Sequence, residues 1–171
     1  GTRHANPSLN PAQSVASIDN DNDTAKEHIN HIKQEWEGPG MDLAIVGLGK
    51  IAQDQHLPAV GGSAAFSLAA IVDQRAVDTH VPVFGSVEAL VASGFAGAVA
   101  ICTPPAARFN IARVAIEAGL HTLLEKPPGL NTSEVDQLTD LARRKGVTLF
   151  AAWHSREAAM VGPAKEHLAG R

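Results

Sequence analysis

The sequence predicts an α/β fold in which a doubly wound, mostly parallel sheet follows a polar N-terminal extension. From Met41 onward, runs of about four to eight apolar residues alternate with helical patterns. Strands that are apolar throughout are typical of a parallel sheet covered by helices on both faces. In addition, residues 1–40 are one quarter apolar, whereas residues 41–171 are half apolar. Only the second part can build a hydrophobic core.

The expected elements follow one another in the order strand, helix, strand. The strands are Leu43–Val46, Leu68–Val72, Val81–Phe84, Ala98–Cys102, Thr122–Leu124 and Val147–Ala151. The helices cover 50–60, 86–92, 105–118, 132–145 and 156–168. Six strands connected in this way fit a sheet built from two mononucleotide-binding halves.

Residues 1–40 are expected to be a disordered or partly helical extension, with one short helix over 23–36. This segment carries three basic and six acidic side chains, and so holds most of the formal net charge of -4. His28 and His31 stand three residues apart in it, but two histidines on a polar helix are expected to be solvated, so no metal site is predicted. Met41 directly precedes the first strand, and we expect it to be the natural start.

Composition excludes several classes of function. No apolar run approaches the roughly 18 residues of a membrane span, so no membrane partner is expected. The mild acidity argues against a nucleic-acid groove, which needs a basic stripe. The single cysteine, Cys102, excludes an intramolecular disulfide framework and favours a reducing, cytoplasmic location. It has no neighbouring base in sequence and is expected to be a buried, unreactive thiol.

The strongest chemical motif is Gly-x-Gly-x-x-Ala at the end of the first strand, formed by Gly47, Gly49 and Ala52. Gly47 permits the tight turn, Gly49 lets the backbone approach a pyrophosphate, and Ala52 lets the helix pack close to the sheet. The helix N-terminus then offers free N–H groups to the phosphates. The alternative is a glycine turn that merely closes the unit.

An acidic residue is expected at the end of the second strand, and Asp73 stands there. Its carboxylate would accept hydrogen bonds from the adenosine ribose and repel a 2′-phosphate, which favours NAD. Arg75 could instead pair with a 2′-phosphate and admit NADP. The alternatives are a surface acid for Asp73 and a solvated side chain for Arg75.

Polar residues also end the fourth, fifth and sixth strands, where ligands of such sheets bind. Glu125 and Lys126 end the fifth strand, and the lysine ammonium could stabilise an alkoxide as a hydride leaves its carbon. The alternative is a structural ion pair on a loop. Trp153 and His154 end the sixth strand and could line a sugar-sized pocket, unless the tryptophan is simply packed and the histidine solvated.

Taken together, four runs resemble the Gfo/Idh/MocA oxidoreductase family. They are G-L-G-K-I-A-Q-D-Q-H-L-P-A, C-T-P-P, E-K-P-P-G and W-H-S-R, and the similarity covers residues 42 to about 168. The first and last runs resemble the bacterial aldose 1-dehydrogenases of this family, which act on galactose or arabinose. The resemblance implies oxidation of a sugar at C1 to a lactone, with NAD or NADP taking the hydride.

The resemblance also implies roles for single residues. Lys126 matches the lysine of the catalytic site and would contact the sugar, as would His154. The cofactor would be covered by Lys50 and Ile51. Thr103 and Pro104 would belong to the loop that runs beside the nicotinamide ribose, and Glu125 would lie near that ribose.

The family places a second α/β domain after the cofactor domain. We therefore expect a Rossmann domain over 41–155 and, over 156–171, the start of a helix leading to a C-terminal domain that this sequence lacks. That domain would supply the general base, most sugar contacts and a surface for homo-oligomers. The 171-residue chain is thus expected to bind dinucleotide with little dehydrogenase activity. Two alternatives stay open: a dinucleotide-binding module without catalysis, and another reaction of the family such as inositol dehydrogenation.

Overall fold

The computed structural model describes residues 40–75, 78–153 and 161–169. The sheet lies in a compact unit that ends at Trp153, and helix α6 (Val161–Ala169) belongs to a second unit, so each is described by itself. Helix α6 confirms the later part of the helix expected over 156–168. The helix expected over 23–36, with His28 and His31, and the predicted sugar contact His154 lie outside the described residues.

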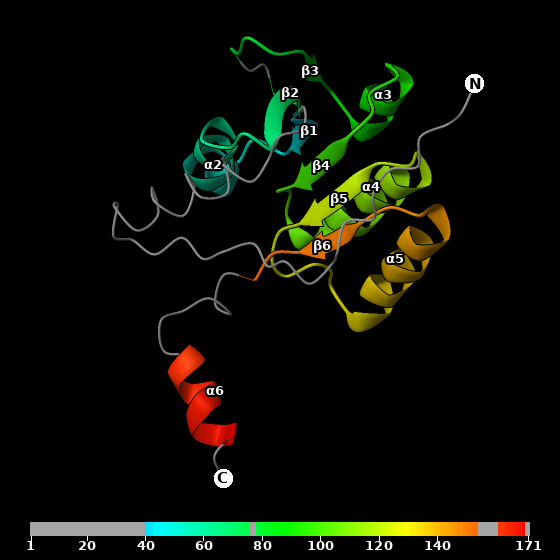
Figure 1. Cartoon of the computed structure of the whole chain (residues 1–171). Helices are drawn as coiled ribbons and strands as arrows, with labels where there is room; N and C mark the ends of the chain where they lie inside the picture. The colour runs from blue at the N-terminus through cyan, green and yellow to red at the C-terminus, as the bar shows by residue number, and fades with distance from the viewer. Residues whose placement is uncertain (1–39, 76–77, 154–160, 170–171) are drawn as a thin grey trace, which may run out of the picture. The chain divides into compact units, whose positions relative to one another are not determined.

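Six parallel strands form one sheet in the order β3-β2-β1-β4-β5-β6 (Figure 1). This is the strand order of a doubly wound dinucleotide-binding sheet, so the predicted fold class is confirmed. The strands are β1 (Met41–Val46), β2 (Phe66–Val72), β3 (Val83–Phe84), β4 (Ala98–Ile101), β5 (His121–Leu124) and β6 (Leu149–Ala151). Two of them, β3 and β6, each begin two residues later than predicted, and Cys102 lies just after β4.

Helical segments connect the strands close to the predicted positions. They are η1 (Ala52–His56), α2 (Leu57–Gly61), α3 (Val87–Ala92), α4 (Pro105–Glu117) and α5 (Thr132–Lys145). None of the helices in the described part of the chain is long and apolar enough to span a bilayer.

The first helical segment differs from prediction because it is not a uniform α-helix. It runs from Lys50 to Gly61, but η1 is a wide π-helical turn in which the Leu57 N–H donates to the Ala52 carbonyl, five residues back. Pro58 follows directly and has no N–H, and its ring would crowd the carbonyl four residues earlier in a regular helix. The wider turn relieves that crowding, so the proline explains the irregularity.

The core is divided between the two faces of the sheet. On one face, side chains of α3, α4 and α5 such as Leu90, Ile116 and Leu138 pack on alternate residues of β1, β2, β4 and β5. On the other face, Ala52 and Val60 from η1 and α2 pack on β1, β2 and β4. Alternate residues of a strand point to opposite faces, so these strands are apolar throughout, as predicted.

At one edge of the sheet, the helices of the described residues cover a single face. Leu123 of β5 and Phe150 of β6 are paired in register and share the face opposite α4 and α5. Phe150 is 46% exposed, because no helix of this unit packs on that face of β6 within the described residues. The sheet therefore leaves an apolar surface open at its β6 edge.

Side-chain caps set the start of the longest helix. The Asn131 side chain accepts a hydrogen bond from the Glu134 N–H (2.9 Å), and the Glu134 carboxylate accepts one from the Leu130 N–H (2.8 Å). This reciprocal arrangement satisfies N–H groups that have no partner inside the helix. The helix ends at Gly146, whose φ of 68° is left-handed and favours glycine.

The backbone at Gly97, before β4, lies very close to the backbone at Asp42, and a substitution can test this close approach. Its φ is +136°, and a Cβ there would lie 2.3 Å from the Asp42 carbonyl oxygen. We expect Gly97→Ala to lower the free energy of unfolding by at least about 3 kcal/mol, through strain and a backbone clash together. Urea denaturation measures the loss.

The matched control for this test is Gly94→Ala. Gly94 also has positive φ (+82°) but open space around a Cβ, so only about 1–2 kcal/mol should be lost there. Equal losses at the two positions would contradict the predicted clash.

Candidate cofactor and active site

Three loops meet at the carboxyl edge of the central strands. The Gly47 N–H donates to the Val72 carbonyl (2.7 Å), the Cys102 N–H to Val46 (2.8 Å), and the Glu125 N–H to Ile101 (3.1 Å). These bonds continue the sheet ladders one residue beyond the strands. They place the segments after β1, β4 and β5 side by side, as the sequence predicted for a ligand site.

The glycine loop after β1 lets other groups come close to its backbone. Gly47 has φ +87°, and a Cβ there would lie 2.9 Å from Thr103 Cγ2, so the turn excludes any larger residue. Around Gly49, by contrast, a Cβ would meet nothing within 4 Å. The fold itself does not require Gly49 to lack a side chain, so its role fits an open surface kept free for a ligand.

The three residues after the glycine loop differ in burial. Ala52 is fully buried against the sheet, which confirms the packing predicted for it. Lys50 is exposed and its ammonium pairs with Asp54. The Ile51 side chain is 38% exposed at the start of the helix, where it is available to cover a bound molecule.

Asp73 is anchored beside the glycine loop. Its carboxylate accepts hydrogen bonds from the Leu48 N–H (2.7 Å) and from the Arg75 guanidinium (2.9 Å). The Arg75 guanidinium holds the pKa of the Asp73 carboxyl well below its usual range, and the backbone N–H groups of Arg75 and Leu48 add to this, while burial opposes it. Asp73 is therefore ionised at neutral pH and is more than a surface acid.

Arg75 is exposed yet held in place. Besides Asp73, it donates to the Leu48 carbonyl (2.8 Å). Its side chain is 66% exposed while that of Asp73 is 8% exposed. The Arg75 side chain is therefore solvated, as the alternative had it, but it is also paired, and a positive group lies directly beside the Asp73 carboxylate.

The segment after β4 carries Cys102, Thr103 and Pro104. Cys102 is buried, and burial raises the pKa of its thiol to about 12, so the expected unreactive thiol is confirmed. Pro104 precedes the first turn of α4. The Thr103 hydroxyl oxygen is buried and has no hydrogen-bond partner within the described part of the chain.

Glu125 and Lys126 diverge at the end of β5. The buried Glu125 carboxylate contacts His56 Nε2 (2.9 Å) and accepts a hydrogen bond from the Lys126 N–H (3.1 Å). The Lys126 side chain is exposed, and no partner for its ammonium is found among the described residues. The two side chains do not form the structural ion pair considered as an alternative, and the lysine is available to a ligand.

Arg108 lies behind these loops and was not singled out from the sequence. It is 4% exposed, and its guanidinium donates to the carbonyls of Thr103 (2.8 Å), Glu125 (2.5 Å) and Pro127. Burial lowers the pKa of this guanidinium, while the Glu125 carboxylate opposes that shift. The signal was available, since Arg108 shares a helical face with the buried Ala112, Ala115 and Ile116.

His56 is the second residue that sequence reasoning missed. It belongs to the run G-K-I-A-Q-D-Q-H, but only the fold brings it next to Glu125, which is 69 positions away. Trp153, after β6, is 71% exposed. It is therefore not a packed core residue, which leaves it available to a ligand.

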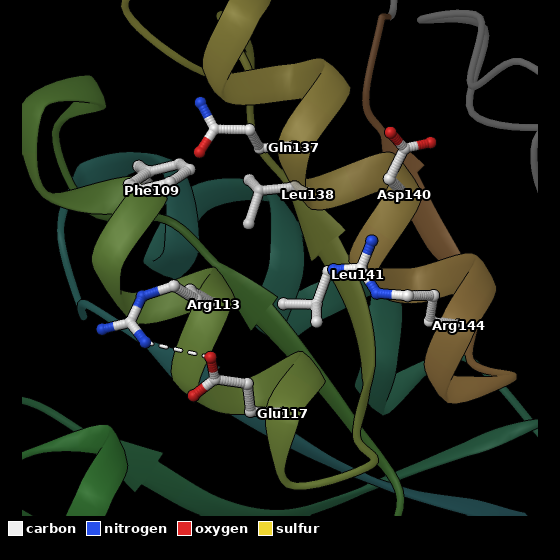
Figure 2. Close-up of a pocket in the computed structure, with 8 residues that line it drawn as sticks. All are labelled: Phe109, Arg113, Glu117, Gln137, Leu138, Asp140, Leu141 and Arg144. Atoms are coloured by element: carbon white, nitrogen blue, oxygen red, sulfur yellow. Dashed lines mark hydrogen bonds and ion pairs between the residues drawn. The ribbon is translucent and has the colours of Figure 1, made fainter.

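Two hollows of the described surface lie mostly outside these loops. One, of about 230 Å³, lies between α4 and α5, where Arg113 pairs with Glu117 (Figure 2). A larger one, of about 560 Å³, lies beside α2 and β2 and shares only Leu48 with the glycine loop. Among residues 40–75, 78–153 and 161–169, no three His, Cys, Asp or Glu side chains gather as a metal ion requires.

The residues of the carboxyl edge fit a dinucleotide. Gly49 leaves space for a pyrophosphate, and the first turn after it offers N–H groups without helical partners. Asp73 offers an ionised carboxylate to a ribose on the β2 side. On the β4 and β5 side, an unpaired ammonium stands where the other half of a dinucleotide would lie.

Known proteins agree with this interpretation. Residues 41–153 match the model of the Gfo/Idh/MocA family, described as an oxidoreductase family with an NAD-binding Rossmann fold. NAD or NADP, the predicted cofactor, is the cofactor class of this fold. The match covers well over half of the chain.

Individual relatives are sugar dehydrogenases. Galactose 1-dehydrogenase of Pseudomonas fluorescens is 45% identical over 87 residues, which is 50% of this chain and 29% of the relative. UDP-N-acetylglucosamine 3-dehydrogenase of Acidithiobacillus ferrooxidans is 33% identical over 116 residues, 64% of this chain and 36% of the relative.

A solved structure extends the similarity to the fold. The crystal structure of D-galactose-1-dehydrogenase from Rhizobium etli superposes with a TM-score of 0.73 at 42% identity, covering 78% of this chain and 44% of that one. The chain thus spans less than half the length of these relatives. Its glycine loop, strand order and carboxyl-edge residues, together with the family match, show that the chain belongs to the Gfo/Idh/MocA oxidoreductase family.

Proposed function

We propose that the chain is the cofactor-binding part of an NAD(P)-dependent aldose 1-dehydrogenase that oxidises galactose or arabinose at C1 to a lactone. The observation that carries the proposal is the exposed Lys126 ammonium, which has no partner among the described residues and lies on the same edge as the open glycine loop. The galactose 1-dehydrogenase relatives support C1 as the position of oxidation. The free thiol Cys102 supports a cytoplasmic location.

In this proposal, residues of this chain bind the cofactor and polarise the sugar hydroxyl. Gly47 and Gly49 hold the turn open to the pyrophosphate, and Asp73 accepts hydrogen bonds from the adenosine ribose. The Lys126 ammonium donates a hydrogen bond to the sugar oxygen and stabilises the alkoxide as its proton leaves. When bound, NAD or NADP supplies the acceptor for the hydride from C1, and C1 becomes the lactone carbonyl.

A general base must take the hydroxyl proton. The exposed titratable groups that the described residues place at the three loops, Lys50 and Lys126, are both ammonium groups. We therefore propose that the base lies in a second domain beyond residue 171. The domain limits follow the same proposal: a cofactor domain over 41–155, and a linker helix from 156. The open apolar surface at Phe150 supports the presence of a further domain.

The relative that oxidises a sugar nucleotide at C3 favours one competing function, oxidation at C3. Turnover by the longer gene product decides between the two. Galactose or arabinose should give a lactone and reduced cofactor, whereas a 3-keto product, or turnover only with inositol, would overturn C1 oxidation. Cofactor binding with no turnover of any of these sugars would favour the binding module.

The first prediction concerns Gly49. Because a Cβ at this position would meet no described atom within 4 Å, Gly49→Val should leave the unfolding midpoint nearly unchanged. The valine would occupy the path of the pyrophosphate, so the dissociation constant for NAD should rise at least about tenfold. Isothermal titration of this chain with NAD measures it.

The control for Gly49→Val is Gly61→Val, because Gly61 has equally open surroundings at the far end of the same helical segment. Its affinity for NAD should match that of the unaltered chain. If Gly49→Val also binds NAD with unaltered affinity, the glycine loop is not the phosphate site.

The second prediction concerns the choice of cofactor. Asp73→Ala removes the charge that repels a 2′-phosphate and releases Arg75, so the affinity for NADP relative to NAD should rise about tenfold or more. Arg75→Ala should shift the ratio in the opposite direction. Titrations with the two cofactors at pH 7 measure the ratio.

The control for the Asp73 variant is Glu88→Ala, which removes one exposed carboxylate from α3 and should leave the cofactor ratio unchanged. A ratio that moves equally in Glu88→Ala and Asp73→Ala would show that net charge, rather than this pair, selects the cofactor.

The third prediction concerns Lys126. In the longer gene product, Lys126→Met should lower kcat by about 100-fold or more while the affinity for NAD stays within about twofold. Steady-state kinetics with galactose measure kcat. Lys145→Met, at the exposed end of α5, is the control, and an unchanged kcat in Lys126→Met would remove its catalytic role.

A further inference from the structure

The buried Arg108 guanidinium links two loops of the site, the one after β4 and the one after β5. Its acceptors are three main-chain carbonyls: Thr103 after β4, and Glu125 and Pro127 after β5. The last two stand immediately before and after Lys126. The backbone on both sides of the exposed lysine is therefore tied to one rigid cation in α4.

A core-filling role alone does not require this arrangement. A buried guanidinium is costly unless its donors are satisfied, and an apolar side chain of similar length would fill the same space without that cost. The planar fork of an arginine can donate to several acceptors at fixed angles, which a lysine cannot do. An arginine at this position is thus explained by the three carbonyls that accept its hydrogen bonds. The space that its side chain fills does not require one.

The Glu125 side chain completes the support from the opposite side. Its carboxylate contacts His56 from η1 and accepts the Lys126 N–H. Arg108 and His56, from two different connections, therefore hold one short segment, while the Lys126 side chain stays exposed. A mobile surface lysine needs no such support, whereas a lysine that must meet a reacting oxygen does.

We propose that Arg108 is a positioning residue, which holds the Thr103 and Lys126 loops in register for the nicotinamide half of the dinucleotide. This inference rests on the proposed function, since it assigns that half to the β4 and β5 side. Asp73, on the β2 side, binds the adenosine half and is not touched by Arg108. The two halves of the ligand should therefore respond differently to a change at Arg108.

The experiment compares Arg108→Met and Arg108→Lys with the unaltered 171-residue chain. NAD and ADP-ribose, which lacks the nicotinamide, are titrated into each. We expect the affinity for NAD to fall at least about fivefold in both variants and that for ADP-ribose to stay within about twofold. Equal losses for the two ligands, or no loss for either, would overturn the proposal.

A second measurement needs no ligand. Hydrogen exchange followed by NMR compares the Lys126 amide with the Cys102 amide, which is bonded to Val46 in the sheet. Exchange at Lys126 should accelerate about tenfold in the variants, while Cys102 keeps its protection. Acceleration at both sites would indicate a purely structural role, and an unchanged Lys126 would show that Arg108 does not hold the loop.

Controls separate the possible failures. Arg113→Met, on the exposed side of the same helix, should change neither measurement. If Arg108→Met does not fold, Arg108→Lys carries the test, because it keeps the charge but not the fork. If the unaltered chain binds neither ligand, the proposed function fails, and the exchange result alone decides whether Arg108 holds the Lys126 loop.

Discussion

The contact between Gly47 and Thr103 is the constraint on which the site depends. β1 lies between β2 and β4, and its end must turn into a helix while the segment after β4 passes close by. The space that a Cβ at Gly47 would need is already filled by Thr103. This close approach aligns the loops after β1 and β4, and the ladder from Ile101 to Glu125 adds the loop after β5.

Charged groups in the interior serve the same edge of the sheet. Arg108 and Glu125 are almost fully buried, and each is satisfied by partners in the loops of the site. Buried charges add little net stability, because desolvation offsets their attraction. Their value here is geometric: they link segments that the hydrophobic core alone would leave independent, and they leave Lys126 as the exposed charge.

In the proposed function, the Asp73–Arg75 pair would decide between the two cofactors. Both oxygens of Asp73 contact Arg75. A ligand without a 2′-phosphate would leave that pair intact. A 2′-phosphate would compete with Asp73 for the guanidinium, so the balance between the two cofactors would depend on the strength of this one ion pair.

The sequence by itself determined the fold class, the order of the elements and the carboxyl edge as the candidate site, because hydrophobic periodicity and the spacing of Gly47, Gly49 and Ala52 are local properties of the chain. It also proposed Asp73, which directly follows β2, and Lys126, which stands two residues after β5. Only the tertiary structure decided that Arg75 is paired, that Glu125 turns inward to His56, and that Arg108 joins two loops. Those contacts link positions up to 69 residues apart, and no local pattern encodes which distant partner a side chain meets. The sequence could not say which strands would carry an open face, because an apolar strand looks alike in sequence whether or not a helix covers it; the structure places Phe150 there.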